Sequence, residues 1–578
     1  MRHTVLAFSV VMSALLSASL WCFANRPVEV QPSWNAPLSS VSFAPFRRGQ
    51  SPLTKVYPTP EQVEQDLAAL QGLSRGIRTY SAREGMEVVP KLAGKLGLKV
   101  IFGAWLTNES EAKGKATNEA EIAALISAAN EYPQEIERVL VGNEVLLRRD
   151  LKPDELIGYI RRVKAAVKQP VSYADVWAFY LKYPEVAREL DYLTIHILPF
   201  WEDEPVPIDQ VEAHIVKIVE RIRQAFPGKP VLIGEAGWPS IGRDRGPAVV
   251  STVNEARFVR TMAEIAQRHQ FDYNIVEAFD QPWKAALENT VGAAWGILDI
   301  DRHAKFTMAG PVTEVADWPK RAAIAIACGA FSALLLGRRL FSLRDCFLLA
   351  VFAQLLAWAV ITTAFHADAV SFRWWQDLWT LLRGGLAAGL AIAVLARVAV
   401  LLRDPTQAEV SAKCPIPDRL GASLTVFYGV YGVCWSFLLL VDGRYRDIPD
   451  IDFCLPVVAL GSLLFLRAWF AKTRGQSVAR ALAFEGLFID PLAGPSWRKN
   501  LVAWLGPALL AGALMAFISE GWAVIGEDFQ KEHPTLNEQL PLVLKGLFAN
   551  REMLLWCLMQ CALSVPYWVS TRLRGQSS

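Results

Sequence analysis

The stretch Val231-Leu232-Ile233-Gly234-Glu235-Ala236-Gly237-Trp238-Pro239-Ser240 decides how the first half of the chain folds. Its first residues are β-branched or aliphatic, which is the pattern of a strand buried on both faces. Pro239 has no N–H to give to a sheet, so the strand ends before it. Glu235 therefore lies at the carboxyl end of a buried strand. In a barrel of parallel strands, this is the end that carries the chemistry.

Seven similar stretches are found between residues 35 and 312, with helical patterns between them. Together with the opening stretch, the predicted strands are 41–44, 76–80, 98–105, 139–144, 171–177, 192–197 and 273–279. Among the helices, one is predicted to begin after the cap Thr59, and another after Asn118, which has Glu121 three residues on. Eight strands that alternate with helices over about 275 residues are typical of a (β/α)8 TIM barrel. A doubly wound α/β sheet would need a glycine-rich phosphate turn after the first strand, which residues 42–46 do not provide.

A second carboxylate stands at the end of the fourth predicted strand, where Glu144 follows Asn143. Glutamates at the ends of strands four and seven would face each other across the barrel mouth. Cleavage of a glycosidic bond needs such a pair, because one carboxyl protonates the leaving oxygen while the other attacks the anomeric carbon or activates water. One strand-end glutamate alone is more often structural, so the pair of Glu144 and Glu235 carries this prediction.

Aromatic residues gather at or just beyond the predicted strand ends. Sugar rings have apolar faces and polar rims, so flat aromatic side chains with Asn, Asp and Gln nearby suit them. Each aromatic taken singly is expected to pack the barrel, whereas together they predict a groove. They are Tyr80, Trp105, Tyr173, Trp177, Phe200, Trp201, Trp238, Phe279 and Trp283. His196 is the only histidine at a strand end and is expected to line the site. Because the sequence has no HExxH motif and no paired His/Cys spacing, we predict no metal centre and no cofactor.

Charge and cysteine content exclude several classes of protein. The net charge of +2 favours neither nucleic acid nor an acidic substrate as a partner. The eight cysteines lie at Cys22 or from Cys328 onward. The segment between these two cysteines therefore has neither a disulfide nor a thiolate nucleophile.

Long apolar runs occur at the N-terminus and throughout the second half of the chain. Residues 4–24 follow the basic residue Arg2 and are long enough to span a bilayer, and we favour an uncleaved anchor over a cleaved export signal. Seven further runs lie near 322–337, 346–366, 384–402, 422–441, 454–471, 501–524 and 553–570. The sequence therefore predicts an anchor helix over 1–24, a soluble domain over 35–312 and an all-α membrane domain over 320–578.

The basic residues between these runs predict a topology, because cytoplasmic loops of membrane proteins are enriched in Lys and Arg. With both termini in the cytoplasm, every basic loop falls inside and the soluble domain falls outside the cytoplasmic membrane. The residues that carry this bias are Arg338, Arg339, Arg344, Arg403, Lys413, Arg419, Lys472, Arg474, Arg480, Arg498, Lys499, Arg572 and Arg574. Arg397 lies within a span and is expected to face the bundle or to snorkel.

Three stretches resemble glycoside hydrolase family 17, the β-1,3-glucanases and β-1,3-glucanosyltransferases. Residues 233–240 are similar to the nucleophile signature of that family, and Val141-Gly142-Asn143-Glu144 is similar to its acid/base strand. Residues 279–284, with Glu288 and Trp295-Gly296, look like the region of its eighth strand. The resemblance covers residues 35–312. It is closer to the membrane-bound proteobacterial branch, which is linked to synthesis of periplasmic cyclic β-(1,3)/(1,6)-glucan, than to the plant members. This resemblance implies a bacterial inner-membrane protein with the soluble domain in the periplasm.

The resemblance implies a retaining mechanism with Glu144 as acid/base and Glu235 as nucleophile. It also implies that Asn143 holds the sugar 2-hydroxyl and that Lys284 and Glu288 lie in the site, although from the residues alone a surface ion pair between these two stays open. The predicted substrate-binding residues are Asn143, Tyr80, Tyr173, Asp175, Trp177, His196, Trp238, Phe279, Gln281, Trp283, Lys284 and Glu288.

Several functions remain open from the sequence. We favour glucan transfer, with β-1,6 linkages or branches as a candidate product, over endo- or exo-hydrolysis of β-1,3-glucan. The expected partners are a β-glucan, the lipid bilayer and a glucan synthase in the same membrane. A glucan-binding, assembly or transport subunit is the alternative of another class, and the presence of both glutamates argues against it.

Overall fold

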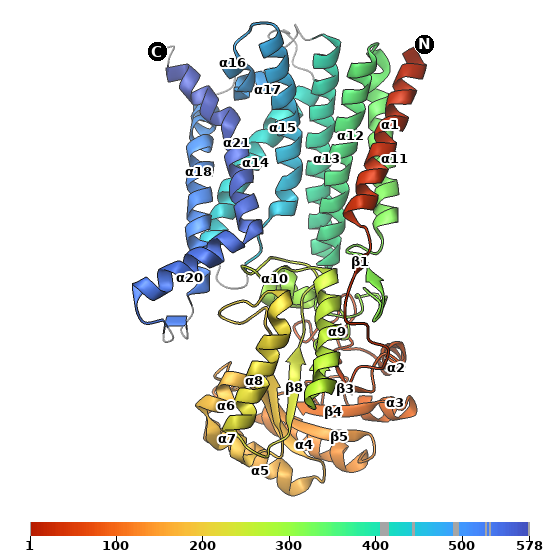
Figure 1. The fold of residues 1–578 in the computed structure, drawn as a ribbon, viewed down its shortest axis with the longest axis vertical. Coiled ribbons are helices and arrows are strands. Elements are labelled where there is room, and N and C mark those ends of the chain that lie inside the picture. Colours follow the sequence, from red (N-terminus) through yellow and green to blue (C-terminus); the bar gives the residue numbers. More distant parts are fainter. Residues whose placement is uncertain are drawn as a thin grey trace. The chain divides into compact units, whose positions relative to one another are not determined.

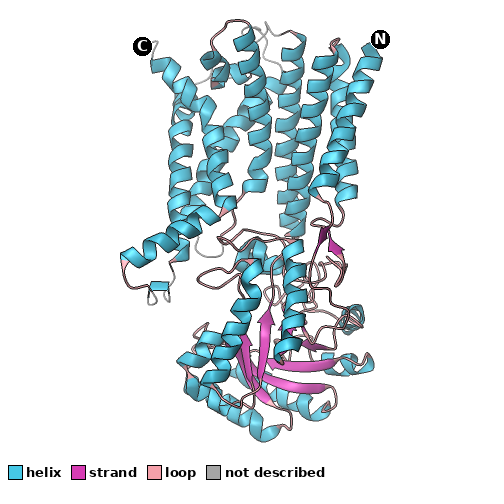
Figure 2. Ribbon diagram, viewed as in Figure 1, coloured by secondary structure: helices cyan, strands magenta, loops and turns pink. Residues whose placement is uncertain are grey.

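In a computed structural model the chain forms two compact units, Pro27–Ala316 and Met1–Arg26 together with Asp317–Ser578. The structure describes residues 2–111, 113–404, 416–441, 446–488, 496–525, 529–530 and 533–575. Figure 1 shows the helices and strands in sequence colours, and Figure 2 shows that the strands all belong to the unit that begins at Pro27.

The unit Pro27–Ala316 is built around a closed barrel of eight parallel strands, which confirms the predicted fold. Each strand pairs with the next along the chain, and the first pairs with the last. The strands are β2 (Val41–Ser42), β3 (Gly76–Arg78), β4 (Lys99–Ala104), β5 (Ile136–Asn143), β6 (Val171–Val176), β7 (Leu193–His196), β8 (Val231–Ala236) and β9 (Asp272–Ile275). All six residues of β8 are buried, as its apolar composition predicts.

Helices follow the strands and cover the barrel. They are α2 (Pro60–Ala69), α3 (Val89–Lys95), α4 (Gly114–Glu131), α5 (Pro153–Ala166), α6 (Trp177–Lys182), α7 (Pro184–Glu189), α8 (Val211–Ala225), α9 (Thr252–His269) and α10 (Ala285–Ala293). The sequence patterns did not predict a second, small sheet. In it, β1 (Val28–Glu29) pairs antiparallel with β10 (Pro311–Val312).

The two predicted helix caps have different outcomes. Thr59 caps α2, and Gln62 completes the capping box. The prediction that Asn118 caps a helix is wrong, because α4 already begins at Gly114. Asn118 instead uses its side-chain amide to hold the backbone of Thr107, at 2.8 and 2.9 Å. Glu121 accepts hydrogen bonds from the backbone N–H groups of Ala82, after β3, and Trp105, in the same loop as Thr107 after β4, so both polar side chains stabilise loops at the barrel mouth.

The other unit is helical. Its helices are α1 (Arg2–Ala24), α11 (Trp318–Leu336), α12 (Leu343–Ala369), α13 (Trp374–Arg403), α14 (Ile416–Val441), α15 (Asp450–Thr473), α16 (Val478–Leu482), α17 (Phe484–Leu487), α18 (Ser496–Val524), α20 (Leu536–Ala549) and α21 (Arg551–Gly575). Among the described residues, eight helices are long and apolar enough to cross a membrane. They correspond to the predicted N-terminal helix and the seven later runs. Lys413, one of the basic residues used to predict topology, lies outside the described residues.

Charged side chains inside this helical unit are paired. Arg397 is 2 % exposed and its Nε lies 3.7 Å from Asp418 on α14, so it faces the bundle. Arg383 on α13 lies 2.7 Å from Asp452 on α15. Pairing between helices is the expected way to keep a charged group within an apolar bundle.

Candidate active site

The backbone before Glu144 turns sharply at the end of β5. Gly142 has φ of +90°, and a Cβ there would lie 2.8 Å from Cγ2 of Val145. Glu144 itself has φ of +51°, a left-handed conformation that non-glycine residues adopt at a cost. Its N–H donates to the carbonyl of Ala174 at 2.7 Å, which holds this conformation. Strain of this kind is typical of a side chain that must point into a functional site.

Glu235 lies near the end of β8 and is held by Arg78, which the sequence analysis missed. Arg78, at the end of β3, is 1 % exposed. Its Nη1 donates to the carbonyl of Gly234 at 2.7 Å and to Oε1 of Glu235 at 3.2 Å, and its Nη2 donates to Oδ1 of Asn143 at 2.5 Å. One guanidinium therefore fixes side chains from β5 and β8 together. The signal for it was an arginine within a predicted buried strand, where a charged residue needs a partner.

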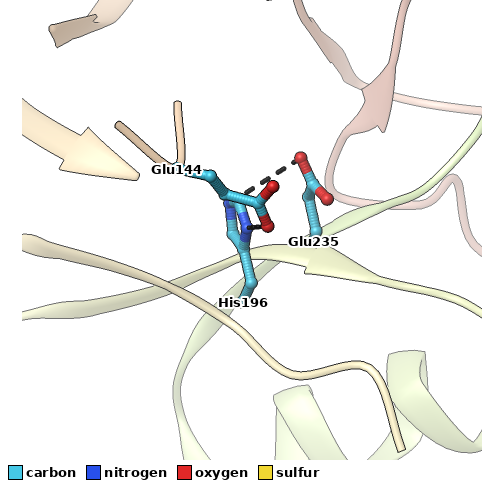
Figure 3. A group of neighbouring side chains, drawn as sticks. All are labelled: Glu144, His196 and Glu235. Carbon is cyan, nitrogen blue, oxygen red and sulfur yellow. Dashed lines mark hydrogen bonds and ion pairs between the residues drawn. The ribbon is translucent and has the colours of Figure 1, made fainter. Parts of the chain in front are cut away.

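His196 lies close to both glutamates (Figure 3). Its Nδ1 lies 3.0 Å from Oε1 of Glu144, and its Nε2 lies 3.7 Å from Oε1 of Glu235. One ligand oxygen from each glutamate and one ring nitrogen of His196 all lie within 4.8 Å of one another. Burial raises the pKa of Glu144, but the hydrogen bond and charge of His196 outweigh it, so the pKa is lowered from its usual value.

Two predicted substrate-binding residues of β6 bond to each other. Tyr173, 1 % exposed, donates its hydroxyl proton to Oδ2 of Asp175 and accepts the N–H of Leu146 at 2.9 Å. Burial raises the pKa of Asp175 to about 7. The structure thus places both side chains in a buried network beneath the barrel mouth, where they support the loop that follows Glu144.

The aromatic residues at the strand ends fall into two groups. Tyr173, Phe200, Trp238 and Phe279 are buried in the core, and the indole Nε1 of Trp238 donates to the carbonyl of Val249 at 3.0 Å. Those that keep exposed area are Tyr80, Trp105, Trp177, Trp201 and Trp283. Only the second group presents aromatic surface outside the core in this conformation.

The segment after β9 brings a further carboxylate to the site. Glu277 is 1 % exposed and forms an ion pair with Lys284. Burial lowers the pKa of Lys284 and raises that of Glu288. Gln281 donates to the carbonyl of Ala44 at 2.6 Å and accepts the indole N–H of Trp283 at 2.7 Å. The sequence analysis missed Glu277, although it lies in a predicted strand like the two other glutamates.

The described residues include one group that could hold a metal ion, formed by Glu144, His196 and Glu235. These ligands come from three different strands, so no local spacing in the sequence reveals them. The absence of a cofactor stays a prediction from the sequence.

Comparison with known proteins identifies the barrel. Residues 40–296 match the family described as the BtgE/BtgC glycoside hydrolase domain. A glucan 1,3-beta-glucosidase of Arthroderma benhamiae is 27 % identical over 264 residues, which cover 42 % of this chain and 82 % of that protein. The protein of the same name from Schizosaccharomyces pombe is 25 % identical over 260 residues, covering 42 % and 79 %.

Solved structures include a glycoside hydrolase family 17 β-1,3-glucanosyltransferase from Rhizomucor miehei. It is 28 % identical, covers 46 % of this chain and 95 % of that chain, and has a TM-score of 0.41.

The barrel and its family match define a glycoside hydrolase domain. Within that class, the match over residues 40–296 and the β-1,3-glucosidase relatives support the predicted assignment of the barrel to glycoside hydrolase family 17.

Proposed function

We propose that this protein is a membrane-anchored enzyme that cleaves and re-forms bonds of β-1,3-glucan with retention of configuration. The observation that carries the proposal is the close approach of Glu144 and Glu235, whose oxygens lie within 4.8 Å of each other. Retaining glycosidases place their two carboxyls about 5–5.5 Å apart, whereas inverting enzymes leave about 6.5–9.5 Å for a water molecule. The names of the two curated relatives support β-1,3-glucan as the substrate class.

In the first step, the carboxylate of Glu235 attacks the anomeric carbon and the glycosidic C–O bond breaks. The pKa of Glu144 is lowered in the free protein, so the substrate complex must first return a proton to it. Glu144 then gives this proton to the departing oxygen, so the leaving sugar departs as a neutral alcohol. In the second step, Glu144 removes a proton from an incoming hydroxyl, which attacks the anomeric carbon and releases Glu235. Asn143 holds the sugar 2-hydroxyl in this scheme, and the hydrogen bond from Arg78 to its Oδ1 supports this role because it fixes the side chain.

The incoming hydroxyl decides between transfer and hydrolysis. We favour a sugar hydroxyl, because the partly exposed aromatic residues Trp105, Trp177, Trp201 and Trp283 offer surfaces on which an acceptor sugar can stack. Transfer to a 6-hydroxyl would make β-1,6 linkages or branches of the kind found in a cyclic glucan. Water as acceptor is the second candidate, favoured by the glucosidase names of the curated relatives.

The location follows from the apolar helices and the basic loops. Eight helices meet the length and composition of membrane spans within the described residues. With both termini in the cytoplasm, the segment between the first two of these helices, which contains the barrel, is periplasmic. There it would meet a glucan delivered by a synthase in the same membrane.

The test uses the full-length protein in detergent, incubated with laminari-oligosaccharides. We expect products longer than the substrate, with linkages identified by methylation analysis, and the β-anomer as the first product seen by NMR. Glu235→Gln is expected to abolish both the longer transfer products and the release of the β-anomer. If only shorter oligosaccharides form, the enzyme is a hydrolase. If Glu235→Gln keeps wild-type activity, the catalytic assignment is wrong.

A further inference from the structure

The histidine close to both glutamates has one ring nitrogen without a hydrogen-bond partner. The His196 side chain is fully buried and Nε2 makes no hydrogen bond, while Nδ1 lies 3.0 Å from Oε1 of Glu144. Figure 3 shows the ring beside the Glu144 carboxylate, with a dashed line from the ring to each glutamate, and Nε2 lies 3.7 Å from Oε1 of Glu235. A buried nitrogen without a partner is uncommon, because it loses water and gains nothing in return.

The hydrogen bond at Nδ1 fixes what Nε2 can offer. An ionised carboxylate only accepts hydrogen bonds, so in a neutral imidazole the proton is on Nδ1, where it is donated to Glu144. Nε2 then carries a lone pair and lies 3.7 Å from Oε1 of Glu235. Two acceptors thus face each other, and a cation between them would satisfy both.

We propose that Glu144, His196 and Glu235 form a site for a divalent transition-metal ion, with Zn²⁺ the best fit, and that the bound ion blocks the active site. One imidazole nitrogen and two carboxylates are ligands that zinc accepts in four-coordinate sites with one position open. Mg²⁺ and Ca²⁺ prefer oxygen ligands throughout, so the histidine selects against them.

Two of the three ligands already lie close to zinc geometry. Zinc bonds of about 2.1 Å in a tetrahedron place neighbouring ligand atoms about 3.4 Å apart. The distance between Nε2 of His196 and Oε1 of Glu235 is 3.7 Å, and one ring nitrogen of His196 lies within 4.8 Å of an oxygen of each glutamate. The side chain of Glu144 is 23 % exposed, so it can give up its hydrogen bond to Nδ1 of His196 and turn toward an ion on Nε2.

Nearby cations make the site reversible. Arg78 already donates to Oε1 of Glu235 at 3.2 Å, and the charge of Lys284 is felt at both glutamates. A metal ion must compete with these groups, so inhibition is reversible and depends on the metal concentration. This inhibition rests on the proposed function, whereas binding of the ion does not.

Binding is tested on the full-length protein in detergent, purified without a histidine tag. Isothermal titration with Zn²⁺ and the visible absorption of added Co²⁺ measure the site, and Cu²⁺ electron paramagnetic resonance reports ligation by one imidazole. His196→Gln and Glu144→Gln are each expected to weaken binding by at least about tenfold. His214→Gln is the matched control, because His214 also pairs with a glutamate, Glu202, at 3.3 Å. Equal thermal midpoints show that the variants are folded.

Failure of the metal site and failure of the proposed function give different results. If Zn²⁺ does not bind, or if His196→Gln and His214→Gln bind it equally well, the metal site is wrong while the proposed function stands. If Zn²⁺ binds through these residues, we expect inhibition that is competitive with laminari-oligosaccharides and is reversed by EDTA. Binding of Zn²⁺ without inhibition would overturn the blocking step and, with it, the assignment of the two glutamates to catalysis.

Discussion

Replacing Arg78 by lysine tests whether one guanidinium organises the active site. The three hydrogen bonds of Arg78 reach Gly234, Glu235 and Asn143 at 2.7, 3.2 and 2.5 Å. A lysine keeps the positive charge but lacks the planar fork, so it cannot serve β5 and β8 at once. Hydrogen bonds to charged groups contribute about 1.5 kcal/mol or more each, so the loss of two costs about 3 kcal/mol.

This cost divides between the free energy of unfolding and the activation barrier. If all of it appeared in the barrier, kcat/KM would fall by about two orders of magnitude. The assay is kcat/KM on laminari-oligosaccharides together with the thermal midpoint of the full-length protein. Arg138→Lys is the control, because Arg138 pairs with the half-exposed Asp272 and such a pair contributes at most about 1 kcal/mol. An Arg78→Lys variant with wild-type kcat/KM and an unchanged midpoint would refute the reasoning.

Three further perturbations have outcomes that the structure fixes. Gly142→Ala places a Cβ at φ of +90° and is expected to cost about 1–2 kcal/mol and most of the activity, whereas Gly158→Ala, in α5 with open space around it, should be neutral or stabilising by up to about 1 kcal/mol in thermal unfolding. The pKa of Asp175 is raised from 3.8 to about 7, so its contribution to stability is lost as the pH rises from about 4 to 7, by up to about 4 kcal/mol. The thermal midpoint of Asp175→Asn, measured relative to that of the wild type, should therefore rise from pH 5 to pH 8. Lys284→Met leaves the buried Glu277 unpaired and should destabilise the barrel by about 3 kcal/mol or more in denaturant titrations, and adding Glu277→Gln should restore most of it.

The barrel could be predicted because each strand carries its own signal. The buried run before Glu235 and the similar run before Glu144 specify strands, and the carboxyl ends of parallel strands meet at one mouth. Asn118 was mistaken for a helix cap because a cap and a loop-holding amide look alike in sequence.

The contacts between strands could not be predicted, because they depend on the register of the closed barrel. Arg78 reaches across from β3 to β5 and β8, and His196 pairs in register with Glu235. Neither contact corresponds to a spacing that could be recognised in the sequence. Burial was equally hidden, since Trp238 and Trp283 both follow strand ends yet only Trp238 is fully buried.

The small sheet of β1 and β10 brings the two ends of the barrel unit together, so the barrel could be deleted or exchanged as one piece. Val28 pairs with Val312, so the chain enters and leaves the barrel unit at adjacent points. In the helical unit, α1 and α11 also pack against each other, although residues 25–317 separate them in sequence. A short loop from α1 to α11 would therefore close the helical unit without the barrel, and a different domain with neighbouring ends could replace it.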